Sequence, residues 1–429
     1  MKSASLKVIL LVAFVDLVSF GLIIPLLPDY AKRFGASGLT LGLVLASFSF
    51  TQMIFSPILG RWSDHVGRRR VLLLSIAGSV VAHVLLGVAD LYVSLPMLFA
   101  ARILDGITGA NIATAQAYIA DVTTPENRAR GMGFFGAAFG LGFVIGPGIG
   151  AGLYILGKVV QGERLATSWP AFGAAVISLV ALTLVWWKMD EPDVHKDYLK
   201  ERGSILDLSA LGAALRHPRL AELFCILFTS MFSFVLLEVS FVYLCKNKFN
   251  LDMSGIGLLF AYIGVMMVIV QGGLVGRLAK RFGEAGLVAV GPFVTASGFL
   301  LIAVVAGMGP ESPAWPLLLI ACVPVSCGNG ITTPNLNALI SRQAAADHQG
   351  GTLGLGQGFG SLARTVGPVV GGWLYDQGPA LPYWTGGTLF VLVGLLALHV
   401  RQRQHDAVHD RGGVAQTPAT SSLPIEESD

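Results

Sequence analysis

The sequence predicts an all-α membrane protein whose 12 transmembrane helices form two pseudo-symmetric bundles of six. Of the 429 residues, 54% are hydrophobic and only 13% are charged, about half the charged share of a soluble domain. The apolar residues gather in continuous runs of about 20, which is the length of a helix that crosses a bilayer. A polar break at residues 188–218 separates six of these runs from the other six.

Each run is expected to form a helix, because a helix satisfies its own backbone groups in lipid and the runs lack the alternation of membrane strands. The first run contains Asp16 and has no small-residue cleavage site, so we expect a retained membrane helix and not a signal peptide. The expected spans are residues 7–28, 39–60, 71–90, 92–119, 131–157, 169–187, 219–243, 253–276, 285–307, 314–340, 351–375 and 382–400.

These spans imply a division of the chain into four segments. Residues 1–187 would form an N-terminal six-helix bundle and residues 219–403 a C-terminal six-helix bundle. Residues 188–218 would be a cytoplasmic linker. The polar, Pro- and Ser-containing residues 404–429 are expected to form a disordered cytoplasmic tail.

The distribution of basic residues predicts the orientation in the membrane. If both termini are cytoplasmic, 21 of the 29 Lys and Arg residues lie on the inner side and six on the outer side. Only Arg102 and Arg364 fall within spans. The positive-inside rule therefore favours this orientation, in a multi-pass protein of a bacterial inner membrane.

The two halves of the sequence repeat. The segment from Gly146 to Tyr154 in the fifth span resembles the segment from Gly367 to Tyr375 in the eleventh, since both begin with Gly-Pro and end with Leu-Tyr. Parallel repeats of six helices are a transporter architecture, with the substrate path at their interface.

Other classes of protein lack support in the sequence. The four cysteines show no CxxC spacing, so neither a metal site nor a disulfide framework is expected. The chain has no HExxH, P-loop or GxSxG motif, which argues against an enzyme or an ATP-driven pump. The basic residues are spread over loops, which argues against binding of nucleic acid. We expect no cofactor.

The loop after the second span carries a motif with defined spacing. Gly60, Asp64, Gly67, Arg68 and Arg69 fit the pattern GxxxDxxGRR, in which the glycines permit a tight turn and the arginines can contact anionic lipid. This loop resembles the signature loop of the major facilitator superfamily. The resemblance to that family extends over essentially the whole chain, from residue 7 to about 400. The alternative interpretation is a basic cytoplasmic loop with no further role.

The copy of this loop in the second half is incomplete. Residues 276–283 keep the glycines but have lost the acidic residue. The first copy also departs from the family pattern, with His65 where Arg or Lys is usual and Arg70 where Pro is common.

The fourth span contains Arg102 and Asp105, followed by Gly106 and Gly109. This segment is similar to the pattern of drug/proton antiporters in the same helix, and the resemblance implies that Arg102 takes part in proton transfer. We expect Asp105 to share this role. An arginine within a membrane needs a partner or a water cavity, and Asp105 shares its helix face. A static Arg–Asp pair is the alternative.

The fifth span resembles the Gly-Pro motif of exporters in this superfamily, and the eleventh span carries a second copy. Glycines allow neighbouring helices to approach closely, and an internal proline bends a helix. The residues of the two motifs are Gly142, Gly146, Pro147, Gly150, Gly367, Pro368 and Gly371.

The first span, with Asp16 followed by Gly21 and Pro25, resembles that of the tetracycline/proton antiporters. Two departures make tetracycline itself a doubtful substrate. The third span has Ala82-His83 where those antiporters carry an acidic residue, and the ninth has no acidic residue between positions 293 and 299.

Ionisable residues within spans mark the expected transport chemistry. We expect Asp16 and Glu238, in the corresponding first and seventh spans, to share proton and substrate binding, because a carboxyl group removed from water titrates nearer to neutral pH. Arg364 would be their counter-ion, a contact for an anionic substrate group, or part of a structural pair. His83 could titrate or simply pack.

Polar and aromatic residues in other spans are further candidates for the substrate cavity, with helix–helix hydrogen bonding as the alternative. These residues are Asn111, Gln116, Phe234, Gln271, Asn335 and Gln357.

Together these features predict a monomeric secondary transporter that exports a lipophilic, drug-like compound in exchange for protons, with a tetracycline-like compound as one candidate. Its partners would be a small-molecule substrate, protons and membrane lipid. A proton-coupled uptake porter for a small metabolite is the alternative within the same fold.

Overall fold

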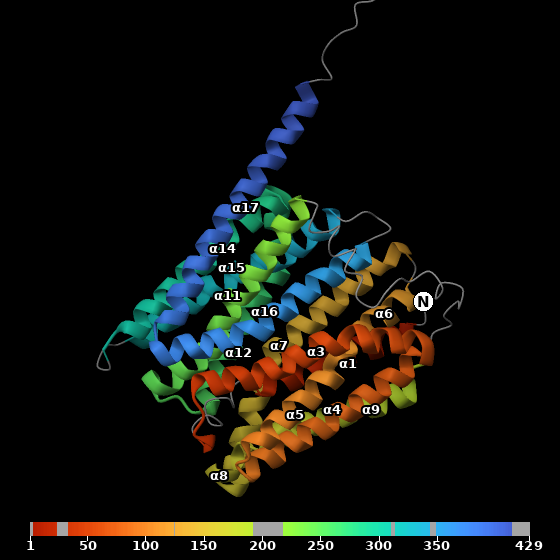
Figure 1. Cartoon of the computed structure of the whole chain (residues 1–429), viewed down its shortest axis with the longest axis vertical. Coiled ribbons are helices and arrows are strands. Elements are labelled where there is room, and N and C mark those ends of the chain that lie inside the picture. The colour runs from red at the N-terminus through yellow and green to blue at the C-terminus, as the bar shows by residue number, and fades with distance from the viewer. Residues whose placement is uncertain are drawn as a thin grey trace, which may run out of the picture.

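The computed structural model describes residues 3–23, 33–123, 125–191, 218–309, 314–343 and 349–413, and nearly all of these residues are helical (Figure 1). Over its described residues, each of the twelve expected spans coincides with a helix or with a helix interrupted once, so the predicted all-α architecture is confirmed. Residues 24–28 of the first expected span lie outside the described residues. Residues 192–217, which are part of the expected linker, lie outside the described residues.

The helices that precede residue 191 form the N-terminal bundle. One of the six expected spans, residues 92–119, is divided, because α5 and α6 are joined by a short 3-10 turn, η2. The short helix α8 precedes α9, which covers the sixth expected span without interruption. The elements are α1 (Ser3–Ile23), α3 (Gly38–Val66), α4 (Arg68–Leu91), α5 (Leu95–Thr108), η2 (Gly109–Asn111), α6 (Ile112–Val122), α7 (Pro125–Gln161), α8 (Glu163–Ala166) and α9 (Trp169–Lys188).

The helices that follow residue 218 form the C-terminal bundle. Its second span is divided by a π-helical turn, η4, which leaves α12 shorter than the other spanning helices of this bundle. The elements are α11 (Pro218–Phe249), α12 (Met253–Ile269), η4 (Val270–Leu274), α13 (Val275–Phe282), α14 (Glu284–Gly307), α15 (Ala314–Gln343), α16 (Gln349–Gln377) and α17 (Leu381–Gly413).

Among the described residues, seven helices are long and apolar enough to cross a membrane by length and composition alone. They comprise α3, α4, α8 with α9, α11, α14, α15 and α17. Large apolar side chains on the outside of the bundles are exposed, for example Leu74, Val81, Val176 and Trp187. Such a surface suits contact with lipid and not with water.

The helices run between two ends of the molecule, which we name the α8 end and the linker end (Figure 1). At the α8 end α3, α12 and α17 begin and α7, α11 and α16 finish. Serine or aspartate side chains cap helices there: Ser37 accepts from Thr40 N, and Asp252 from Gly255 N. At the linker end, Gly67 and Gly283 have positive φ values and each separates two consecutive helices.

Glycines bring pairs of helices into backbone contact within each bundle. A Cβ atom on Gly146 of α7 would lie 2.8 Å from both the Gly21 Cα and the Val18 carbonyl oxygen of α1. In the C-terminal bundle, a Cβ atom on Gly371 of α16 would lie 3.2 Å from the Leu236 Cα of α11. The two Gly-Pro segments thus pack against corresponding helices, as the repeat leads one to expect.

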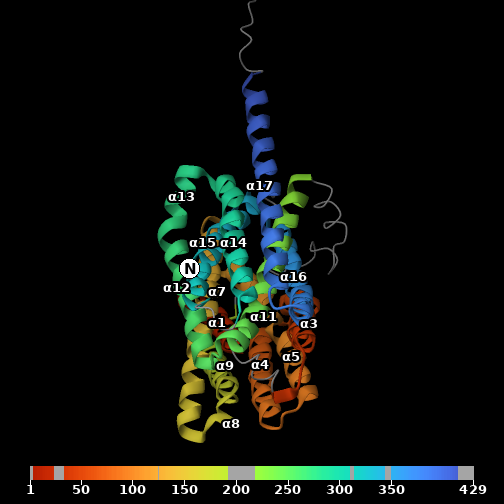
Figure 2. The same ribbon diagram turned by 90° about the vertical axis from the view of Figure 1, so that its left-hand side faces the viewer.

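The last helix departs from the sequence expectation. Residues 404–429 were expected to form a disordered tail, but α17 continues to Gly413 and projects beyond the other helices (Figure 2). Residues 401–411 contain no proline or glycine and mix basic and acidic side chains, which permits helical continuation. Residues 414–429 lie outside the described residues.

We expect Gly146→Val to lower the stability of the protein by about 1–3 kcal/mol, because the added side chain would collide with the backbone of α1. Thermal unfolding of the detergent-solubilised protein measures the change. Gly152→Val is the matched control, since Gly152 lies in the same helix with nothing within 4 Å of the position of a Cβ atom. Equal midpoints for the two variants would contradict this account of the α1–α7 contact.

Candidate functional site

The motif loop between α3 and α4 is held within the N-terminal bundle by Arg68, which is 2% exposed. Its guanidinium forms ion pairs with Asp64 and, at 2.9 Å from Nε to Oδ2, with Asp121 at the end of α6. It also donates to the Ser63 hydroxyl at 2.6 Å. Arg68 therefore ties the end of α3 and the start of α4 to α6.

Arg69 connects the same loop to the end of α9 and the residues that follow it. The backbone N–H of Arg69 donates to the Glu191 carboxylate, and its guanidinium donates to the Trp186 carbonyl oxygen. A Cβ atom on Gly67 would lie 2.8 Å from the same carboxylate, so glycine is required there by both space and its φ of 109°. The spacing of glycine, aspartate and arginine in this motif thus places the charged side chains of the loop within reach of their partners.

A buried polar cluster lies in the middle of the N-terminal bundle. Arg102 Nη1 on α5 is 2.7 Å from Asp105 Oδ2, and the Phe48 ring of α3 covers the guanidinium at 4.3 Å. The other carboxylate oxygen of Asp105 lies 3.7 Å from His83 Nε2 on α4. The Nδ1 atom of His83 lies 3.2 Å from the Ser178 hydroxyl on α9. Four helices thus contribute to one cluster.

This cluster places a carboxylate between a permanent cation and a titratable imidazole. All three ionisable side chains are buried, with 2% exposure for Arg102, 7% for Asp105 and 4% for His83. Ionised groups in such surroundings need partners, and gain or loss of a proton changes the net charge of the cluster. The sequence predicted the pair of Arg102 and Asp105, but it gave no signal that His83 would contact it.

In the C-terminal bundle, Glu238 of α11 and Arg364 of α16 lie near enough to interact electrostatically without forming a direct ion pair. Both side chains are half-buried. The Arg364 guanidinium donates to the Ser361 hydroxyl at 3.1 Å. One residue beyond Glu238, Val239 shares an apolar cluster with Leu41 of α3, so this part of α11 borders the N-terminal bundle.

The backbone of Asp16 lies in α1, but its side chain lies outside the described part of the chain. The glycine contacts align α1 with α11, since Leu22 faces Gly150 as Leu236 faces Gly371. By this alignment Asp16 corresponds to Ser230, and Glu238 lies eight residues further on, about 12 Å along the helix. The two acids therefore occupy corresponding helices at different depths.

The remaining predicted cavity residues differ in their surroundings. Asn111 lies buried in the η2 turn, and Asn335 donates to the Ile331 carbonyl oxygen of its own helix at 2.7 Å. Phe234 packs against the main core cluster of the C-terminal bundle. Gln271 in η4 and Gln357 in α16 are exposed, and Gln116 is half-buried.

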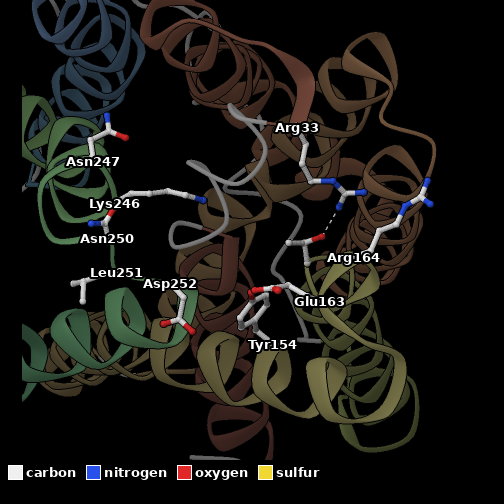
Figure 3. Close-up of a pocket in the computed structure, with 10 residues that line it drawn as sticks. Arg33, Tyr154, Glu163, Arg164, Lys246, Asn247, Asn250, Leu251 and Asp252 are labelled. Atoms are coloured by element: carbon white, nitrogen blue, oxygen red, sulfur yellow. Dashed lines mark hydrogen bonds between the residues drawn. The ribbon is translucent and has the colours of Figure 1, made fainter.

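A cavity of about 610 Å³ opens between the two bundles at the α8 end (Figure 3). It mixes cationic and anionic side chains, and Arg33 in its wall is ion-paired with the buried Asp90 at 2.7 Å. No predicted substrate residue is among its described lining residues. Its described walls consist of Arg33, Tyr154, Glu163, Arg164, Thr167, Lys246, Asn247, Asn250, Leu251 and Asp252.

Comparison with known proteins finds one family. The sequence profile of the Major Facilitator Superfamily matches residues 9–364 and 274–424. The class B tetracycline resistance protein of Escherichia coli is 30% identical over 388 residues, which cover 90% of this chain and 91% of that protein. Multidrug resistance protein 1 of Bacillus subtilis (strain 168) is 28% identical, with coverage of 92% and 95%.

Solved structures show the same fold. The human organic anion transporter MFSD10 (TETRAN) is 25% identical, with a TM-score of 0.67 and coverage of 92% of this chain and 99% of that chain. The nucleoside transporter NupG is 12% identical, with a TM-score of 0.71 and the same coverage.

Asp105→Asn is expected to destabilise the protein by roughly 3 kcal/mol, because the buried Arg102 would lose its nearest carboxylate. The drop in the midpoint of thermal unfolding measures this effect. Adding Arg102→Gln should restore part of the loss, since the charge is then removed together with its partner.

The exposed pair of Lys158 and Glu163 provides the control. Because exposed ion pairs contribute little, Glu163→Gln should leave the midpoint unchanged. The account of the buried cluster would be wrong if Asp105→Asn also left the midpoint of thermal unfolding unchanged.

Proposed function

Because the chain belongs to the Major Facilitator Superfamily of transporters, we propose that it exports a lipophilic, drug-like compound in exchange for protons. Tetracycline and multidrug resistance proteins are among its relatives, each aligned with about nine-tenths of the chain. These relatives support efflux as the direction of transport and a lipophilic compound as the substrate. A tetracycline is one candidate.

The observation that carries the proton half of this proposal is the buried cluster of Arg102, Asp105 and His83. An ionisable cluster inside a membrane-spanning bundle is costly, and proton relays are a common reason for its presence. His83 and Asp105 would exchange a proton when their 3.7 Å contact shortens to hydrogen-bond distance, while Arg102 keeps a positive charge beside them. Protonation of this cluster would bias the arrangement of the two bundles.

The compound would compete with protons at Glu238. This carboxyl group lies in a part of α11 that borders both bundles, with Arg364 as the nearby cation. A cationic group of the bound compound and a proton would both lower the net negative charge there, so binding of one would oppose binding of the other. Asp16 would take part from the corresponding helix of the N-terminal bundle.

We assign the linker end to the cytoplasm, because the basic residues of the inter-helix loops gather there. Residues 1–187 and 219–403 would then move as two bundles joined by the linker at residues 188–218. The close contacts of α3 with α16 and of α7 with α12 lie toward the α8 end. By this assignment the two contacts would close the described arrangement toward the outside, beside the cavity of Figure 3.

Transport into proteoliposomes with an imposed pH gradient tests the exchange. With an acidic lumen, an antiporter accumulates external compound in the lumen, whichever way the protein is inserted. We expect accumulation of tetracycline or of the lipophilic cation ethidium, lost when a protonophore collapses the gradient. Accumulation only with an acidic exterior would favour the uptake porter, and flux indifferent to the gradient would exclude proton coupling.

Variants then separate coupling from binding. Asp105→Asn, Asp16→Asn and Glu238→Gln should lose gradient-driven accumulation, because each removes a group that carries the proton. Of these three variants, only Asp105→Asn should retain the exchange of labelled for unlabelled compound, because the cluster of Arg102, Asp105 and His83 would not touch the compound. Glu284→Gln, which changes an acid at the start of α14 that is not among the described lining of the cavity or in the ionisable clusters, is the control and should transport as the parent does.

A further inference from the structure

An acidic side chain of one bundle caps a helix of the other. Asp376, in the last turn of α16, accepts hydrogen bonds from the backbone N–H groups of Gly38 and Leu39, both at 3.0 Å. These are the first two residues of α3, whose N–H groups have no partner within their own helix. The carboxylate also lies at the positive end of the α3 dipole, where a negative charge is stabilised.

Close backbone contact surrounds this hydrogen-bonded pair. A Cβ atom on Gly372 would collide with the Gly38 carbonyl oxygen, and one on Gly42 with the Pro368 carbonyl oxygen. Beside them Tyr375 stacks on Tyr243 of α11, with ring centroids 5.1 Å apart. Asp376 therefore lies at the tip of a dry contact between α3 and α16 and is itself exposed to solvent.

The corresponding contact in the other half of the repeat lacks such an acid. There α7 packs against α12, and a Cβ atom on Gly257 would collide with Ala151 of α7. At the repeat offset of the Gly-Pro segments, Asp376 corresponds to Ile155. The start of α12 is capped from within its own bundle by Asp252, which accepts from Gly255 N at 2.9 Å. Among the residues that the structure describes, only the contact between α3 and α16 carries such an acid-to-helix link between bundles.

We propose that Asp376 is a positioning residue that stabilises the arrangement closed at the α8 end. The link exists only while α3 and α16 touch, so it favours the closed arrangement over one in which the bundles separate there. Because Asp376 and Leu39 are exposed, water can take over both hydrogen bonds during opening. The contact therefore biases the equilibrium without preventing the change.

Distances between spin labels in the full chain, in lipid nanodiscs, test this role. Tyr92 and Trp384 are exposed residues of the two bundles at the α8 end and serve as label positions, with the four native cysteines replaced by alanine. Asp376→Asn is expected to raise the ratio of long to short distances by roughly two- to thirtyfold, the range for loss of a helix cap. Asp376→Glu keeps a carboxylate and should stay near the parent.

Ser37→Ala is the matched control. Ser37 caps the same helix end at 3.1 Å from Thr40 N, but it belongs to the same bundle as α3 and forms no link across the contact. We expect an unchanged distance distribution for it. The proposal is overturned if Asp376→Asn matches the parent, or if Ser37→Ala opens the α8 end equally. The readout needs neither compound nor protons, so it stands apart from the test of proton exchange.

Discussion

The architecture depends on how closely helices can approach one another in lipid. With no hydrophobic effect to drive helices together there, packing must come from small residues that let backbones touch. The Gly-Pro segments meet this need twice, α7 against α1 and α16 against α11. The first partner helix carries Asp16 and the second carries Glu238, so the glycines determine where the two acids lie relative to the rest of each bundle.

The ionisable groups of the two bundles differ in how they are surrounded. In the N-terminal bundle, Arg102, Asp105 and His83 are enclosed by four helices, which suits groups that exchange protons away from a compound. In the C-terminal bundle, Glu238 and Arg364 are half-buried and not directly paired, which leaves them able to meet a ligand. This difference is consistent with a division between proton transfer and substrate binding.

The sequence predicted the twelve helices because run length, glycine and proline are local signals. It missed features that depend on which faces meet. The contact of His83 with Asp105 joins α4 to α5, and Asp376 reaches α3 from 338 residues away. The η4 turn and the continuation of α17 were also missed, since an apolar run does not reveal a change of helical pitch and a polar run does not exclude a helix. Charges within spans predicted the pair of Arg102 and Asp105, but not the contact of His83 with that pair.

Proton exchange is the central claim, and the movement of protons themselves tests it most directly. Purified protein would be placed in vesicles that contain the pH-sensitive dye pyranine, at equal pH on both sides, and an outward gradient of the transported compound would be applied. Exchange predicts that the lumen becomes more acidic as the compound leaves, and that a protonophore abolishes the change. Exit of the compound at constant luminal pH, or with a rise in luminal pH, would contradict the account.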